Sequence, residues 1–349
     1  MTGSANEGSE QRRRLLGTKL RALVSEHVGV NVESEPVEFG TGAGLVHDSA
    51  AWVIVDGPAE RVLGASLAWA VRQGASSLDV VADNAGGQLA RRASGFSIPI
   101  GVWFPQDRTL LPVVVEPAPV APMAASEHLE LISLIESGGA RAIIERGVVT
   151  GDVRGLEVCR VVDEPTVGNF AELNDVPADL ITRPEPGVML EVGVGANDRE
   201  AFQLIHGHVP TVDALAEVVS SVSSFRRAEA PQHPLNRMAP ERFLRWRLEQ
   251  DPSLLGFRSV RPVDPPVPRQ SMKHTEPCVA TAIDRTGAPV AVVFSSGVDV
   301  DLVPFVADVT LDLPSDVERV IVAAPQRDLV ALTHDLAALL ARPVELVGI

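Results

Sequence analysis

Short apolar runs alternate with helically spaced apolar residues through the first third of the chain, which is the pattern of strands joined by helices. This pattern predicts a helix over 13–27, strands at 51–56, 77–83 and 98–104, and helices at 58–73 and 86–94. Pro99 lies at the start of its strand and indicates a sheet edge, because proline has no N–H to donate. The alternation predicts a sheet with a parallel portion and covering helices.

The same patterns continue through the rest of the chain, interrupted by a polar loop over 163–186. They predict helices at 126–137, 198–206, 211–226, 240–250 and 328–341, and strands at 148–150, 156–162, 188–194, 318–324 and 344–347. Two further strands, 278–283 and 289–295, are expected to form a hairpin with Thr286 and Gly287 in its turn, followed by a short helix or loop at 301–308.

Two proline-rich stretches, 112–122 and 262–268, are typical of linkers. We therefore expect an α/β protein with mixed sheets, covering helices and two or three modules. A flexible arm is expected at 1–16, followed by an N-terminal α/β module at 17–115, a middle α/β module at 123–260 and a C-terminal α/β module at 270–349. The N-terminal and C-terminal modules share the order strand–helix–strand–helix–strand. A repeat would explain this order, and so would the frequency of the pattern in α/β proteins.

The composition of this 349-residue chain argues against several kinds of binding and catalysis. Its formal charge is −16, and Lys19 and Lys273 are its only lysines among 30 basic residues. The acidity opposes general binding to nucleic acid or anionic lipid. Tyrosine is absent, so no phenolic acid is available. No stretch approaches the ~18 apolar residues of a membrane span and the first residues are polar, so a cytoplasmic protein without membrane association is expected.

Four smaller features are expected to be structural. Cys159 and Cys278 lie in apolar runs and are predicted to be buried small hydrophobes. The pair His206 and His208 has no further ligand at a recognisable spacing. The glycine cluster 40–44 lacks the residues of a phosphate loop and is expected to be a mobile loop. Asp299 and Asp301 lack the further oxygens of a calcium loop, so a helix cap is favoured.

A glycine turn after a predicted strand forms the most motif-like segment. Glu191, Gly193 and Gly195 resemble the first motif of class I methyltransferases, and the resemblance implies a site for S-adenosylmethionine. The chain departs from that motif because Asn197 or Asp198 stands at its last glycine position. The alternative is a tight turn in which Asn197 caps the next helix and Glu200 completes a capping box. Both interpretations stay open.

Three acids, Asp152, Glu157 and Glu191, lie on or beside neighbouring predicted strands. They resemble, in degenerate form, the core of the restriction-endonuclease-like superfamily, and the resemblance implies Mg²⁺ held by these carboxylates. The lysine of that core is missing, because neither lysine has an acid two positions before it. The alternative is that Glu157 faces solvent and Asp152 belongs to a turn. No other cofactor is expected.

An arginine-rich predicted helix, 240–250, is the candidate for partner contact, carried by Arg242, Arg245 and Trp246. The alternative is that Trp246 packs inward with Phe243, three positions earlier.

The whole chain resembles conserved proteins of unknown function from high-GC bacteria, through its use of Arg for Lys and its abundance of Ala, Val and Gly. This resemblance implies no activity. We expect a non-catalytic interaction or scaffold protein with an unknown protein partner, because no catalytic constellation is complete. The alternatives are a metal-dependent enzyme that processes nucleic acid and, less favoured, a protein resembling methyltransferases.

Overall fold

The computed structural model describes residues 3–57, 61–84, 86–166, 168–177, 181, 185–206, 209–227, 233–269 and 276–349. Its chain forms two compact units, one made of 1–119 with 297–349 and the other of 120–296. The chain passes from the first unit to the second at 119/120, inside the proline-rich stretch, and returns at 296/297. The fold is mixed α/β, as the hydrophobic pattern predicts. Among the described residues, no helix has the length and apolar character needed to cross a membrane.

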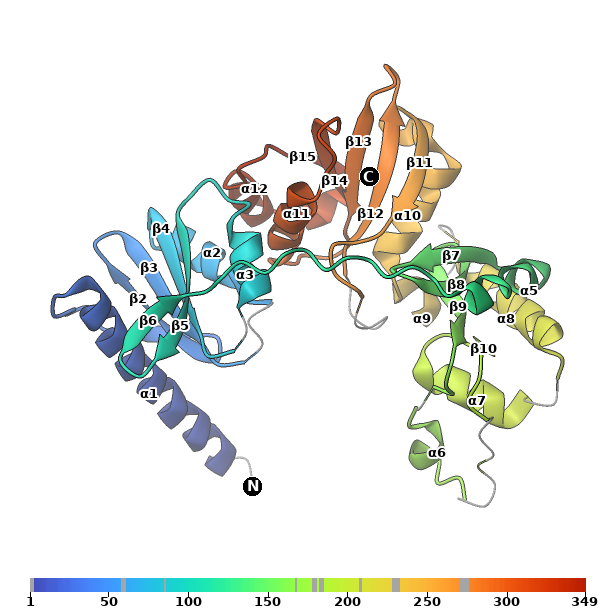
Figure 1. Cartoon of the computed structure of the whole chain (residues 1–349), viewed down its shortest axis with the longest axis horizontal. Helices are drawn as coiled ribbons and strands as arrows, with labels where there is room; N and C mark the ends of the chain where they lie inside the picture. Colours follow the sequence, from blue (N-terminus) through green and yellow to red (C-terminus); the bar gives the residue numbers. More distant parts are fainter. Residues whose placement is uncertain are drawn as a thin grey trace. The chain divides into compact units, whose positions relative to one another are not determined.

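The first unit contains a six-stranded mixed sheet in chain order (Figure 1). Its strands are β1 (Val37–Phe39), β2 (Gly42–His47), β3 (Ala50–Val55), β4 (Ser77–Ala82), β5 (Ile100–Gln106) and β6 (Thr109–Pro112). Strands β3, β4 and β5 are parallel and the outer pairs are antiparallel. The helices of this unit are α1 (Gly3–Val28), α2 (Leu63–Arg72), α3 (Gly87–Ala93), α11 (Leu302–Leu311) and α12 (Ala331–Ala337), and β14 (Arg319–Ala324) pairs in parallel with β15 (Glu345–Gly348).

Apolar residues cover both faces of this sheet. One core cluster lies between α1 and the sheet and includes Leu20, Leu23, Val24, Leu45, Trp52 and Ile54. The alternate residues of β3, Ala51, Val53 and Val55, are also buried. Side chains alternate between the faces of a strand, so a strand buried at every position must be covered on both sides. The uninterrupted apolar run at 51–55 reflects this double burial.

Two expectations about this unit are wrong. Strand β5 is not at an edge, because it lies between β4 and β6; Pro99 precedes its first residue, so no sheet hydrogen bond is lost. The glycine cluster 40–44 is not a mobile loop, because Gly42 begins β2 and its Cα lies so near the Ile54 carbonyl that a Cβ would clash at 1.8 Å. The described part of the arm, 3–16, continues α1.

The similar ends of the first and last predicted modules meet inside this unit. Phe96 and Leu340 form an antiparallel bridge, with the Ser97 N–H donating to Leu339 and the Ala341 N–H donating to Gly95. The two segments therefore hold each other through their backbones. Whether they are repeats of one sequence stays a prediction.

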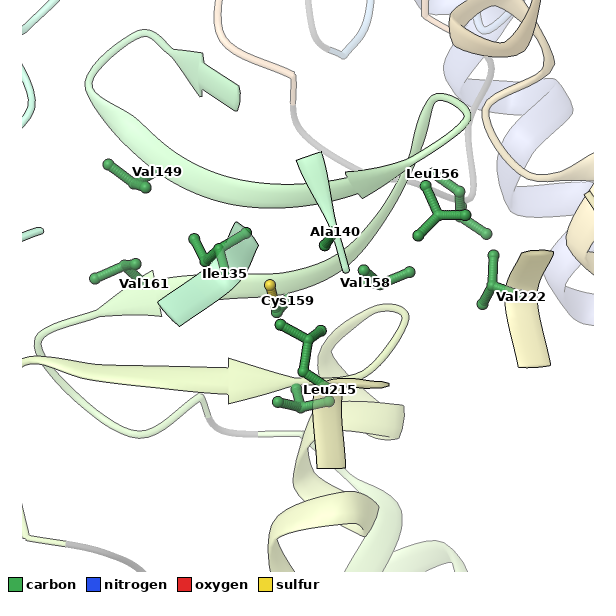
Figure 2. Close-up of a cluster of buried hydrophobic side chains, with 11 residues drawn as sticks. Ile135, Ala140, Val149, Leu156, Val158, Cys159, Val161, Leu215 and Val222 are labelled. Carbon is green, nitrogen blue, oxygen red and sulfur yellow. The ribbon is translucent and has the colours of Figure 1, made fainter. Parts of the chain in front are cut away.

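The second unit contains an antiparallel sheet in the order β10-β9-β8-β7, formed by β7 (Arg141–Glu145), β8 (Val148–Val153), β9 (Leu156–Val162) and β10 (Met189–Val192). Its core, shown in Figure 2, packs Val149, Val158 and Cys159 against Ile135 and Leu215. Those last two lie on α5 (Ile132–Ser137) and α8 (Thr211–Phe225). The predicted helix 126–137 is divided into α4 (Ser126–Leu129) and α5.

The remaining elements of this unit are α6 (Phe170–Leu173), α7 (Ala196–His206), α9 (Pro234–Arg237), α10 (Pro240–Gln250) and the antiparallel strands β11 (Phe257–Val263), β12 (Cys278–Asp284) and β13 (Pro289–Phe294). The predicted hairpin is confirmed, because the Gly287 N–H donates to the Asp284 carbonyl at 3.1 Å between β12 and β13. Helix α10 packs on these strands.

Candidate functional site

A bulge in β9 brings two charged side chains to one face of the sheet. Between Cys159 and Glu157 the pairing with β8 slips by one position, so Val158 is an extra residue. Without it, residues three apart would point to opposite faces. With it, Arg160 donates from Nε and Nη2 to the two carboxylate oxygens of Glu157, each at 2.9 Å.

Helix α7 adds a second guanidinium group to this pair. Arg199 Nη1 donates to Glu157 at 3.2 Å, and Arg199 Nε lies 3.3 Å from a carboxylate oxygen of Glu191 on β10. Arg199 therefore connects the acids of two neighbouring strands. Glu191 also accepts from the backbone N–H of Thr166 at 2.6 Å and from its hydroxyl. Both oxygens of Glu191 are thus engaged within the protein.

The turn between β10 and α7 depends on close backbone approach. Gly193 has a φ of 137°, and a Cβ there would lie 2.8 Å from the Arg199 nitrogen. Asp198 holds the turn by accepting from the Val194 N–H at 2.6 Å. Asn197 and Glu200 were predicted to cap the helix after the glycine turn, and this is wrong in the helix they contact. Asn197 Oδ1 and Glu200 accept from the N–H groups of residues 169 and 170 at the start of α6.

The third predicted acid, Asp152, is directly opposite Glu157 in the β8–β9 pairing but serves a turn. Its carboxylate accepts from the Gly155 N–H at 2.7 Å, and burial raises its pKa. Among the residues that the structure describes, no group of three or more His, Cys, Asp or Glu side chains could hold a metal ion. The charged side chains that contact Glu157 and Glu191 are instead arginines.

A pocket of about 460 Å³ opens over Glu157 and Arg160. Among the residues that the structure describes, five arginines and two glutamates line it: Arg146, Arg160, Arg199, Arg242, Arg269, Glu145 and Glu157. The start of α7, Gly195 to Asn197, and several apolar residues complete the lining: Val148, Val194, Met238, Ala239 and Pro268. Such a volume is that of a small-molecule site. The described lining residues include no aromatic side chain.

The arginines of the pocket are anchored by partners. Arg242 donates to Glu145, and Arg146 Nη1 donates to the Pro265 carbonyl at 3.0 Å. Arg269 pairs with the buried Glu241 at 3.1 Å, and burial raises the pKa of Glu241. Fixed guanidinium groups lose little rotamer freedom when a ligand arrives. The pocket is therefore preorganised for groups that accept hydrogen bonds and carry negative charge.

The three residues predicted to contact a partner have different environments. Arg245 is only 2 % exposed, donates to the Val279 carbonyl and lies 3.4 Å from Glu249, so it is an interior residue and not a surface one. Arg242 lines the pocket. Trp246 is half-buried, stacks on Phe243 at 5.6 Å and lies under the Arg154 guanidinium at 5.5 Å.

The other sequence candidates are structural. Cys159 and Cys278 are buried free thiols, as predicted, and burial raises the pKa of each to about 12. The pair of His206 and His208 lies outside the residues whose side chains the structure describes. Asp301 accepts from the Gly64 N–H in the first turn of α2, and Arg61 lies 3.6 Å from Asp299 and 3.7 Å from Asp301. The predicted helix cap is wrong, because the side chain of Asp301, the N-cap residue of α11, makes no cap hydrogen bond there and contacts α2 instead.

Replacing Asp301 with asparagine is expected to change how stability depends on pH. Burial, with the neighbouring Asp299 charge, raises the Asp301 pKa from 3.8 to about 6. Between those values the folded state retains a proton that the unfolded state has lost, so wild-type stability falls as pH rises. We expect D301N to gain about 1–3 kcal/mol relative to the wild type between pH 4 and pH 7. Parallel stability curves in urea titrations would contradict this.

The pocket itself is the feature that the sequence analysis missed. Its arginines are separated by up to 123 residues (269 − 146) and share no motif. The only available signal was the combination of abundant arginine with acids on adjacent strands.

Comparisons with known proteins add no relationship. A scan against protein-family models gives no match, and searches of curated proteins and of solved structures give none either. The interpretation of the site therefore depends on its own geometry.

Proposed function

We propose that this chain is a non-catalytic binding protein and that its arginine-lined pocket holds a small anionic molecule. The observation that carries the proposal is the gathering of five arginines around about 460 Å³ in a chain of charge −16. Guanidinium groups recognise carboxylates and phosphates through paired hydrogen bonds. The sequence predicts an interaction protein with an unknown partner, and we propose a small anionic molecule as that partner.

Partial neutralisation of the arginines supports a binding role. Glu145 and Glu157 lie in the pocket lining, and Glu191 and Glu241 engage its arginines from behind. These four carboxylates keep the five guanidinium groups folded together without an excess of repulsion. A ligand that brings further negative charge would meet an electrostatically favourable site, since the pocket excludes part of the solvent.

Calorimetry with pyrophosphate and with citrate tests the proposal on the full chain. We expect at least one of these anions to bind the wild type, and R160Q to raise its Kd at least tenfold, because the substitution removes a two-pronged donor. The matched control is R319Q. Arg319 makes the same pair of 2.9 Å hydrogen bonds with Glu345 outside the pocket, so its loss should leave the Kd unchanged. Failure of both anions to bind would overturn the proposal.

A metal-dependent nuclease is the second candidate, favoured by the three acids on neighbouring strands. Arg160 and Arg199 would repel a cation placed beside Glu157. We therefore propose anion binding first and expect a Mn²⁺ titration to give no heat of binding. A Mn²⁺ site that is lost in E157Q would reverse this order.

A further inference from the structure

Glu157 holds the position that an anionic ligand would be expected to take. One of its oxygens accepts from Arg160 and from Arg199 at once, at 2.9 and 3.2 Å, and the other accepts from Arg160 at 2.9 Å. The carboxylate therefore lies where two guanidinium groups from β9 and α7 converge, inside the pocket. Its own side chain belongs to a bulge, which directs it there.

We infer that a phosphate group of a small aliphatic phosphorylated molecule binds between Arg160 and Arg199 and replaces the Glu157 carboxylate there. This inference depends on the proposed anion-binding function. The ligand would compete with the Glu157 carboxylate for Arg160 and Arg199. Glu157 would therefore exclude weakly charged molecules from this position.

The arrangement of donors favours phosphate over a carboxylate. Arg160 of β9 and Arg199 of α7 donate at this point, and the first turn of α7, with Ala196 and Asn197, also lines the pocket. First-turn N–H groups have no acceptor within their own helix. A carboxylate offers two oxygens in one plane, whereas a phosphate offers three in a tetrahedral arrangement and carries more charge. The extra oxygen and charge allow it to displace Glu157.

The rest of the pocket favours an aliphatic ligand. Val148, Val194, Met238 and Pro268 supply apolar contact, and the described lining offers no aromatic ring for stacking a base. The space exceeds that of a single phosphate, so the phosphate would carry an organic group. All basic side chains among the described lining residues are arginines, so recognition would depend on arginine.

Calorimetry of the full chain with glycerol 3-phosphate, pyrophosphate and citrate tests the inference, with all titrations at the same ionic strength. We expect E157Q to lower the Kd for the two phosphates about tenfold, because the competing charge is removed while the side chain keeps its size. R160Q should raise the same Kd at least tenfold. The matched control E345Q removes an equivalent carboxylate outside the pocket and should leave the Kd unchanged.

The outcomes separate the two proposals. If wild type, E157Q and R160Q bind none of the anions, both proposals fail. If the wild type binds a phosphate and R160Q weakens it, but E157Q binds no more tightly, the pocket stands and the displacement of Glu157 is overturned. If citrate binds and neither phosphate does, the pocket stands and the phosphate assignment is overturned. Thermal melts of each variant confirm that it is folded at the titration temperature.

Discussion

Replacing Arg226 with methionine is expected to lower the free energy of unfolding of residues 120–296 by about 3–5 kcal/mol. Arg226 follows α8 and is 1 % exposed. Its guanidinium donates to the carbonyls of Arg154, Leu235, Met238 and Ala239, at 3.0, 2.8, 2.6 and 2.8 Å. These four carbonyls belong to the β8–β9 turn and to the segment around α9. Methionine fills the space but leaves them without these donors.

Burial lowers the Arg226 pKa to about 10, yet the group stays protonated at neutral pH. The charge is tolerated because four carbonyl oxygens solvate it, which is why removing the donors has a large effect. Hydrogen exchange of the full chain in urea gives the loss for this unit alone. The matched control is R227M at the exposed neighbouring position, which should change stability by less than about 0.5 kcal/mol. A loss below about 1 kcal/mol in R226M would show that water replaces the guanidinium.

The alternation of apolar and polar residues predicted most of the long elements and few of the short ones. Strands β3, β4 and β9 and helices α8 and α10 were predicted because each contains several apolar positions at one period. Strands β1, β6 and β7 were missed. They have three to five residues, and periodicity cannot be recognised over so few positions. The seven-residue strand β11 was also missed, because Pro262 and Val263 at its end lie in the proline-rich stretch interpreted as a linker. Gly42 was misread because glycine in a strand gives the same local signal as glycine in a loop.

The acids of the candidate site were predicted and their partners were not. The strand pattern placed Glu157 and Glu191 on neighbouring strands, as they are in the structure. The bulge at Val158 changes which side chains share a face, and no sequence rule located it. Arg199 comes from a helix 39 residues beyond Arg160 (199 − 160), so only the folded chain shows that both arginines contact one carboxylate. A cluster interpreted as a cation site is therefore surrounded by cationic groups.

Replacing Asp308 with asparagine is expected to destabilise the first unit by about 3 kcal/mol. Asp308 lies on α11, is fully buried and accepts from Arg91 Nε at 2.7 Å, Arg91 Nη2 at 3.1 Å and Arg92 Nε at 3.1 Å. One carboxylate thus binds two guanidinium groups of α3 and offsets part of their charge. Asparagine keeps the size of the side chain but loses the charge and one of the two acceptor oxygens. Two buried positive charges on α3 would then repel each other at low dielectric.

The contact is also long-range, because it joins residues more than 200 positions apart, across the whole inserted unit. Loss of Asp308 should therefore weaken hydrogen-exchange protection in α3 and α11 together, rather than in α11 alone. The control is D335N, at an exposed position on α12 of the same unit, which should change neither. If D308N lowers protection in α11 while α3 keeps its wild-type values, the carboxylate stabilises only its own helix. The association of 297–349 with 1–119 would then depend on apolar packing, such as that of Gly95 against Ala307.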